Sequence, residues 1–194
     1  MFMKFIIKEL VFIVRSIFFI PHLILFLCSR NRQIIEHDIV AMEKSKSFCK
    51  KGIPLLIYLL EYNKYFRTLF YVRIGSVSSF VKWYSAGEST FFVCENIGGG
   101  VYLAHPFATI LNAKKIGKNF TCRQCTTIGN KRDGDNENLP IIGDNVILGA
   151  NVVVIGNINI GNNVVVGAGS VVVKNVPDNC IVAGNPAKII RKIL

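Results

Sequence analysis

The second half of the chain repeats its apolar positions every six residues. The repeating positions are Ile142, Leu148, Val154, Ile160, Val166 and Val172. Four places after each of the first four stands another branched apolar residue, and glycine directly follows four of the six. An amphipathic helix needs a period near 3.6, so this pattern excludes a helix. It favours short strands of branched residues, separated by Gly and Asn turns whose backbone tolerates positive φ.

Hexads of this kind stack into a three-sided parallel β-helix, with three hexads to a coil. Upstream positions continue the spacing at Ala104, Ile110, Ile116, Cys122 and Ile128. The step from Ile128 to Ile142 is fourteen residues rather than twelve, which indicates a loop inserted at 130–141. We predict a mainly β fold, in which an α-helical region over 1–90 precedes a β-helix domain over 91–194 with about four coils.

The first thirty residues are strongly apolar but interrupted by charge. The charged residues up to position 15 are Lys4, Lys8, Glu9 and Arg15. The uncharged stretch between Arg15 and Arg30 has 14 residues and contains Pro21, whereas a spanning helix needs about 20 apolar residues. A spanning helix or signal peptide therefore fits poorly, and we expect two helices instead. They either lie in a membrane interface beside acidic head groups or form a contact between copies.

Composition excludes a disordered chain, because 51% of the 194 residues are hydrophobic and 18% are charged. The net charge of +11 attracts polyanions. Basic residues of the repeats are not interleaved with aromatic residues, so we expect no nucleic-acid partner. Six cysteines lack disulfide or four-ligand zinc spacing, and Cys122 and Cys125 form a lone C-x-x-C. We expect a reduced cytoplasmic protein, with the inner membrane face as the alternative place.

Candidate chemistry within the repeats rests on one imidazole. Three histidines occur, and His22 and His37 lie outside the repeats, so a three-histidine metal site on the solenoid is excluded and no metal is expected. His105 lies in the repeat region, in the segment Val101–Pro106. Imidazole is the usual general base near neutral pH, which makes His105 the candidate catalytic residue.

Three segments around these residues carry a family resemblance. They read IGGGVYLAHPFATILNA, TTIGN and VPDNCIVAGNPAKIIRK. Together with the broken repeat, they resemble the serine acetyltransferase-like branch of the hexapeptide-repeat acyltransferases, and also polysaccharide-biosynthesis O-acetyltransferases. The resemblance implies a left-handed β-helix, a homotrimer and acetyl-coenzyme A in a cleft between subunits. It implies that His105 takes the proton from an acceptor hydroxyl, which attacks the thioester carbonyl directly.

The resemblance also implies a set of cofactor-binding positions. Gly129, Ala150 and Ala168 match residues that border the pantetheine arm, where small side chains let an extended ligand approach the backbone. Packing between coils is the alternative role for these three. Lys174 and Lys188 lie towards the C-terminus and could meet the phosphates of coenzyme A, or they could be solvated surface charges.

Two departures from the family bear on the acceptor. Thr90 or Ser89 stands where serine acetyltransferases have an acid that orients the histidine, and Leu139 stands where they have a second histidine. We expect Glu95 to replace the orienting carboxylate. Leu139 cannot hydrogen-bond a substrate carboxylate. The expected function is therefore acetyl transfer to a sugar hydroxyl of a surface polysaccharide, with L-serine O-acetylation or a noncatalytic scaffold as alternatives.

Overall fold

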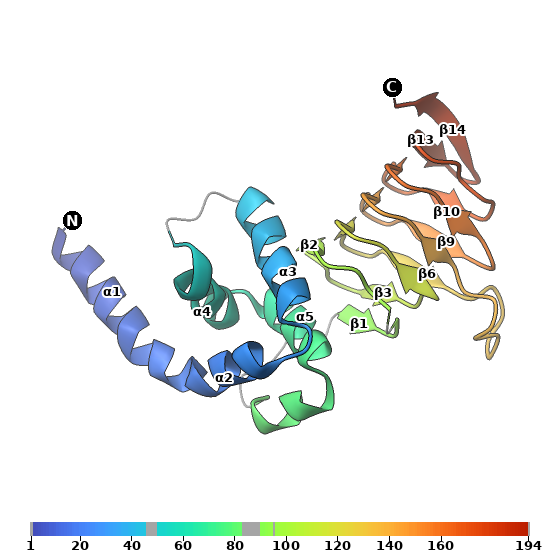
Figure 1. The fold of residues 1–194 in the computed structure, drawn as a ribbon. Coiled ribbons are helices and arrows are strands. Elements are labelled where there is room, and N and C mark those ends of the chain that lie inside the picture. The colour runs from blue at the N-terminus through green and yellow to red at the C-terminus, as the bar shows by residue number, and fades with distance from the viewer. Residues whose placement is uncertain (1, 46–49, 83–89, 95, 194) are drawn as a thin grey trace.

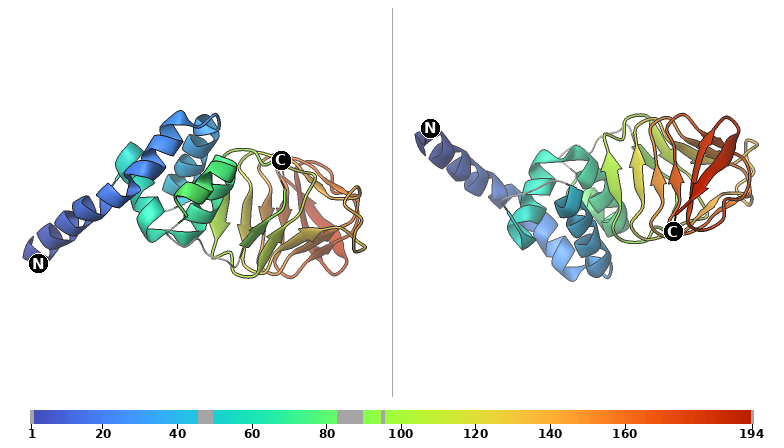
Figure 2. Two further views of the ribbon diagram at one scale, coloured as in Figure 1. Left: turned by 90° about the horizontal axis from the view of Figure 1, so that it is seen from below. Right: turned by 90° about the horizontal axis from the view of Figure 1, so that it is seen from above.

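The computed structural model describes residues 2–45, 50–82, 90–94 and 96–193. A group of helices at one end of the molecule joins a three-sided prism of short strands at the other (Figure 1). Helix α1 extends away from the other helices, and the C-terminus lies on the prism (Figure 2). The expected order, a helical region followed by a parallel β-helix, is confirmed.

The helical region contains α1 (Phe2–Ser16), the 3-10 turn η1 (Ile17–Phe19), α2 (Ile20–Cys28), α3 (Arg32–Ser45), α4 (Gly52–Tyr62), α5 (Lys64–Ile74) and the 3-10 helix η2 (Gly75–Phe80). Pro21 lies in the first turn of α2, where its missing N–H costs no hydrogen bond. The chain therefore continues through η1 into α2 with a change of helix type. One stretch, Glu9–Cys28, is long and apolar enough to cross a membrane by length and composition, and 17% of it is buried.

The prism is built from strands of two to six residues. They are β1 (Thr90–Phe92), β2 (Tyr102–Ala104), β3 (Thr109–Leu111), β4 (Lys115–Ile116), β5 (Thr121–Arg123), β6 (Thr127–Gly129), β7 (Ile141–Ile142), β8 (Ile147–Leu148), β9 (Val153–Ile155), β10 (Asn159–Ile160), β11 (Val165–Val166), β12 (Val171–Val172), β13 (Cys180–Gly184) and β14 (Ala187–Lys192). Among the described residues they form three sheets, in the orders β1-β3-β6-β9-β12, β10-β7-β4 and β14-β13-β11-β8-β5-β2.

We refer to the β1-to-β12 sheet as sheet A and to the β2-to-β14 sheet as sheet C. Their pairings are parallel, except that β14 runs antiparallel to β13. Strand β1 adds a level before the four coils expected, so sheet A has five strands in the described part of the chain. The five α-helices described hold more residues than the strands, so the chain is not mainly β.

Each side of the prism stacks one apolar residue from every coil on the next. On sheet A, Leu111, Ile128, Val154 and Val172 are neighbours in register, and all are buried. The prediction that Ile110 is a buried position of the repeat is wrong, because its side chain is 41% exposed while that of Leu111 is fully buried. Leu103, not Ala104, stacks on Cys122 in sheet C, although Ala104 is also buried. The regular spacing thus begins only at Ile116.

Asparagines turn one corner of the prism. Asn119, Asn145, Asn163 and Asn179 have φ between 55° and 57°. Each of the first three donates from its side-chain amide to the amide oxygen of the next, over 2.8 to 2.9 Å. Asparagine tolerates this left-handed backbone, and the ladder satisfies its polar side chain.

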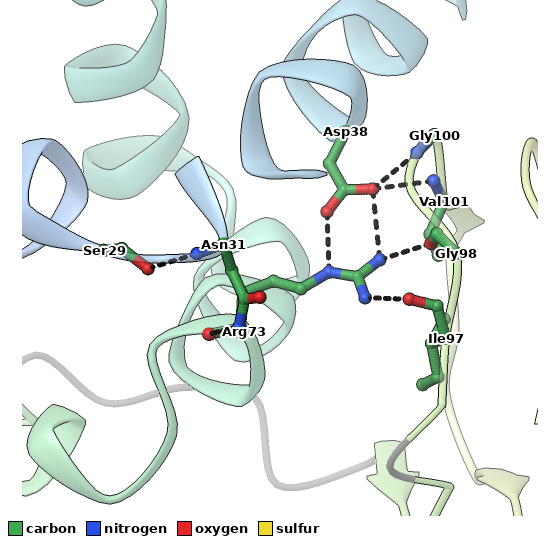
Figure 3. A network of polar contacts seen from close by, with 8 residues as sticks. All are labelled: Ser29, Asn31, Asp38, Arg73, Ile97, Gly98, Gly100 and Val101. Atoms are coloured by element: carbon green, nitrogen blue, oxygen red, sulfur yellow. Dashed lines mark hydrogen bonds and ion pairs between the residues drawn. The ribbon is translucent and has the colours of Figure 1, made fainter. Parts of the chain in front are cut away.

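The helices are fixed to the first coil by a buried ion pair (Figure 3). Arg73 of α5 donates to Asp38 of α3 over 2.9 Å and to the carbonyl oxygens of Ile97 and Gly98 over 2.5 and 2.7 Å. Asp38 in turn accepts from the backbone N–H groups of Gly100 and Val101 over 2.8 and 2.9 Å. The pair thereby satisfies backbone groups at the start of the prism, where no further coil precedes them.

Candidate active site

His105 lies at a widened corner directly after β2. The chain takes eight residues from Leu103 to Leu111, two more than a hexad, and five from Leu111 to Ile116. His105 and Ala108 have φ of 55° and 48°, a left-handed conformation that is uncommon for residues other than glycine. The His105 side chain is exposed. The left-handed φ recurs at this corner in Cys125, Asn151 and Gly169, whereas that of His105 is additional. Local backbone strain of this kind clusters at functional sites.

The corner opens onto a pocket of about 310 Å³ between the prism and the helices. Its lining residues are Met42, Tyr62, Asn63, Lys64, Tyr65, Tyr102, Leu103 and His105. Tyr62 to Tyr65 form the turn between α4 and α5, which the sequence analysis did not identify. Asn63 caps α5 by accepting from the N–H groups of Tyr65 and Phe66. That local signal indicates where a helix starts, but not that the turn faces His105.

The side chain of Thr90 contacts the backbone of the segment that holds His105. Strand β1 pairs with β3 so that Thr90 opposes Thr109, and the buried Thr90 hydroxyl donates to the carbonyl oxygen of Pro106. The residue that replaces the family's acid therefore does lie beside the candidate base, but it bonds to backbone. Glu95 and Ser89 lie outside the described residues.

His105, Ala150 and Ala168 lie along one edge of the prism, the corner between sheets C and A. Backbone hydrogen bonds connect successive levels of this edge: the N–H of Cys125 donates to Phe107, that of Asn151 to Gln124 and that of Gly169 to Ala150. These bonds span 2.8 to 3.0 Å. Ala168 is exposed and Ala150 half-buried, so these two levels of the edge carry small side chains, while the level between them and His105 holds the exposed Arg123.

Gly129 lies at the opposite edge of sheet A. It ends β6, and its carbonyl oxygen accepts from the N–H of Gly156 over 3.0 Å. A Cβ built on Gly129 would meet no atom within 4 Å, whereas one on Gly149 would come within 2.6 Å of the Ala168 nitrogen. Packing between coils therefore explains Gly149 but not Gly129. The predicted cofactor positions divide between two edges within one chain.

Lys174 and Lys188 are both exposed and lie far along the prism from His105. Lys174 follows β12, the fifth strand of sheet A, and Lys188 lies in β14 opposite Ala183. From β3, the strand after His105, to β12 there are three steps between neighbouring strands, or about 14 Å. The two lysines can meet a ligand held at His105 only if that ligand is long and runs along the prism axis.

Cys122 and Cys125 lie in different surroundings. Cys122 points into the core beside Leu148, and burial raises the pKa of its thiol to about 12. Cys125 lies at the corner with φ of 58°. Among the described residues no group of three or more His, Cys, Asp or Glu could hold a metal ion.

A larger pocket of about 540 Å³ lies beside the His105 pocket, and Tyr102 lines both. His37, Lys44 and Lys118 line the larger one, together with Asn119 and backbone of the glycine turn. Its described lining contains no carboxylate. We assign the chemistry to the smaller pocket because it contains the imidazole at the strained corner, and the larger one offers cationic groups beside it.

Comparison with known proteins agrees with this geometry. Residues 140–174 match the family model described as bacterial transferase hexapeptide (six repeats). A protein named for acetyl transfer in colanic acid biosynthesis, WcaB of Escherichia coli (strain K12), is 48% identical over 94 residues, which cover 48% of this chain and 57% of WcaB. Serine acetyltransferase 2 of Arabidopsis thaliana is 40% identical over 96 residues, covering 49% of this chain and 30% of that protein. The matched part of the chain thus spans 57% of the length of WcaB and 30% of the length of the Arabidopsis enzyme.

Solved structures extend the likeness into the helical region. Serine acetyltransferase of Neisseria gonorrhoeae in complex with serine is 30% identical, covers 81% of this chain and 68% of its own, and has a TM-score of 0.63. The coenzyme A complex of serine acetyltransferase from Brucella abortus strain S19 is 24% identical, with a TM-score of 0.66 over 84% of this chain and 68% of its own, and shows the shared fold. By repeat, sequence and structure, this chain belongs to the hexapeptide-repeat transferase family.

Proposed function

We propose that this protein is an acetyl-CoA-dependent O-acetyltransferase that uses His105 as general base to acetylate a sugar hydroxyl of a surface polysaccharide. The observation that carries the proposal is the exposed His105 at a left-handed, widened corner that opens onto a pocket. Family membership and named acetyltransferase relatives support the reaction class.

The reaction needs one proton acceptor and one nucleophile. An imidazole nitrogen of His105 removes the proton of the acceptor hydroxyl while its oxygen attacks the thioester carbonyl of the acetyl group. The tetrahedral intermediate collapses by breaking the carbon–sulfur bond. The coenzyme A thiolate leaves and takes the proton, and the acceptor keeps the acetyl ester. Neither an enzyme-bound acyl group nor a metal is required.

The proposed donor site runs from His105 along the edge that holds Ala150 and Ala168. Small residues at Ala150 and Ala168 leave these levels of the edge open, which suits the approach of an extended pantetheine arm. The direction of this edge leads toward Lys188, while Lys174 follows β12 at the edge that holds Gly129; the ammonium groups of both lysines would meet the phosphates. Gly129 lies at the other edge of sheet A, and a site completed by a second subunit would use both edges. The proposal therefore includes the homotrimer and the left-handed coil that the family implies.

The acceptor is assigned to a sugar for two reasons. WcaB, whose name places it in colanic acid biosynthesis, is 48% identical over the matched 94 residues. His37, Lys44 and Lys118 line the pocket beside His105 and suit an anionic acceptor, such as a sugar linked to a nucleotide or lipid through phosphate. Such intermediates are assembled on the cytoplasmic side, where we place the protein. L-Serine is the second candidate acceptor, because a relative 30% identical was solved with serine bound.

Thiol release from acetyl-CoA tests the proposal, with nucleotide-linked sugars and L-serine as separate acceptors. We expect release with sugars, and His105→Ala to lower kcat by about 10² to 10⁴-fold while calorimetric binding of coenzyme A is kept. His37→Ala is the matched comparison: it removes another exposed imidazole, which lines the proposed acceptor pocket and does not lie at the reacting atoms, so it should raise the KM for the acceptor and leave kcat within a few-fold. Release with serine alone would move the function to the second candidate. Absence of both release and coenzyme A binding would favour a noncatalytic scaffold.

A further inference from the structure

Two charged side chains of helix α1, those of Glu9 and Arg15, reach toward the rest of the protein. The Glu9 carboxylate pairs with Lys50 over 2.8 Å, and Arg15 pairs with Glu61 of α4 over 3.1 Å. Phe12, on the same side of the helix, lies under the Lys50 ammonium. Helices of soluble proteins normally bury their apolar stripe and expose the charged one. In α1 this arrangement is reversed.

The outward side of α1 and its continuation into α2 is apolar. Met3, Ile7, Leu10, Val14, Ile17 and Ile24 each expose more than half of their surface. Within α1 these positions are three or four residues apart, which places them on one face of the helix. Both views in Figure 2 show α1 projecting from the other helices, and the exposure of these six side chains means that no described element covers them. We call these six residues the outer stripe.

The net charge of residues 1–32 indicates what kind of partner covers the outer stripe. Among residues 1–32 the basic residues are Lys4, Lys8, Arg15, Arg30 and Arg32, and Glu9 is the one acid. Arg15 and Arg32 pair with Glu61 and Glu36 further along the chain, and the segment itself keeps an excess of positive charge. A second copy of the segment would bring the same excess of positive charge against it. An anionic lipid surface instead offers an apolar layer for the stripe and negative head groups for the cations.

We propose that α1 and the start of α2 lie in the surface of an anionic membrane, with the outer stripe at the boundary between head groups and acyl chains. The segment lies along the membrane and does not cross it, because crossing would break the Glu9–Lys50 and Arg15–Glu61 ion pairs. Phe19 and Phe26 further along the segment are buried against the other helices, which holds this part to the protein.

Flotation of the full chain with lipid vesicles tests this surface. Vesicles of phosphatidylethanolamine with phosphatidylglycerol should bind the protein, and vesicles of phosphatidylcholine alone should bind it much less. Leu10→Asp and Val14→Asp should each weaken binding to anionic vesicles about tenfold or more. Ile190→Asp is the matched control, because it places the same charge on an exposed apolar residue of β14, at the far end of the molecule, and should bind as the wild type does.

Three outcomes would overturn the proposal. Binding that resists extraction with alkaline carbonate would mean that the segment crosses the bilayer. Failure to bind vesicles, with a wild-type oligomer that Leu10→Asp dissociates, would assign the stripe to a contact between copies. Equal binding by wild type and both stripe variants would exclude the stripe itself. Acetyl transfer to a soluble acceptor should be unchanged in these variants, so a failure of the proposed enzymatic function is distinguishable.

Discussion

Asp38 and Arg73 face each other across the junction between helices and prism, with 2.9 Å between Asp38 Oδ2 and Arg73 Nε. Both side chains are nearly fully buried, and both also bind backbone groups of the first coil. Burial raises the pKa of Asp38, although Arg73 and the N–H groups of Gly100 and Val101 favour the carboxylate. Asp38 therefore depends on Arg73 and the two N–H groups to remain charged inside the protein, and Arg73 depends on Asp38 as its counterion.

Replacing Asp38 by Asn should destabilise the protein by about 3 kcal/mol or more, because Arg73 would keep its charge without a counterion. Glu36→Gln is the matched control. Glu36 pairs with Arg32 on the exposed side of the same helix, and the change should cost about 0.5 kcal/mol or less. Urea unfolding followed by circular dichroism measures both. Equal losses in the two variants would show that the buried pair does not hold the junction.

Alanine substitutions at two glycines distinguish a role in packing between coils from a role in contact with the ligand. Gly149→Ala should lower the free energy of unfolding by about 1 to 3 kcal/mol, because its Cβ would come within 2.6 Å of the Ala168 nitrogen. Gly129→Ala should leave stability unchanged or slightly higher, since the added methyl group meets no atom within 4 Å.

The same Gly129→Ala variant should raise the KM for acetyl-CoA if the pantetheine arm passes this edge. Steady-state kinetics at saturating acceptor measures the effect, and thermal unfolding of the same sample shows whether the fold is intact. An unchanged KM in a stable variant would remove Gly129 from the donor site.

The stability of the helical region should depend on pH through His22. Burial lowers the pKa of His22 from 6.5 to about 4, and Arg67 nearby adds to the shift. Below pH 6.5 His22 therefore binds a proton in the unfolded chain, but in the folded chain it does so only near pH 4. The free energy of unfolding should fall over this window as the pH falls, by up to about 3 kcal/mol.

His22→Gln is the control for this dependence. The raised pKa of Asp38 acts in the opposite direction at acid pH, so the quantity to follow is the difference between wild type and His22→Gln. That difference should shrink as the pH is lowered from 7 to about 4. A constant difference would mean that His22 gains its proton equally in the folded and unfolded chains.

The hexad period was sufficient to predict the prism from Ile116 onward. Each coil there buries the same small set of residues, so local spacing and burial coincide, as at Ile142 and Leu148. The prediction failed by one residue at Ile110, because the His105 corner adds two residues and the next hexad loses one. A widened corner changes the spacing of the apolar positions without changing the amino-acid composition of the repeats. A search for a fixed period therefore does not detect it.

The candidate site was predicted only in part. His105 stands out as the imidazole within the repeats, and its family resemblance gave it a role. The turn from Tyr62 to Tyr65 has no comparable signal, because its place opposite His105 depends on how the helices dock on the first coil. Asp38 and Arg73 are 35 residues apart in sequence, and nothing local pairs them.

The covered parts of the two prism ends also bear on how the molecule behaves in a crowded solution. A parallel solenoid offers a row of unpaired N–H and carbonyl groups at each end, and such edges recruit further strands and lead to fibrous aggregates. Asp38 and Arg73 occupy these groups on Ile97, Gly98, Gly100 and Val101 at the first coil, while the reversed strand β14 covers sheet C at the last. The ion pair thus protects solubility as well as fold, and its loss should favour end-to-end growth of the chains.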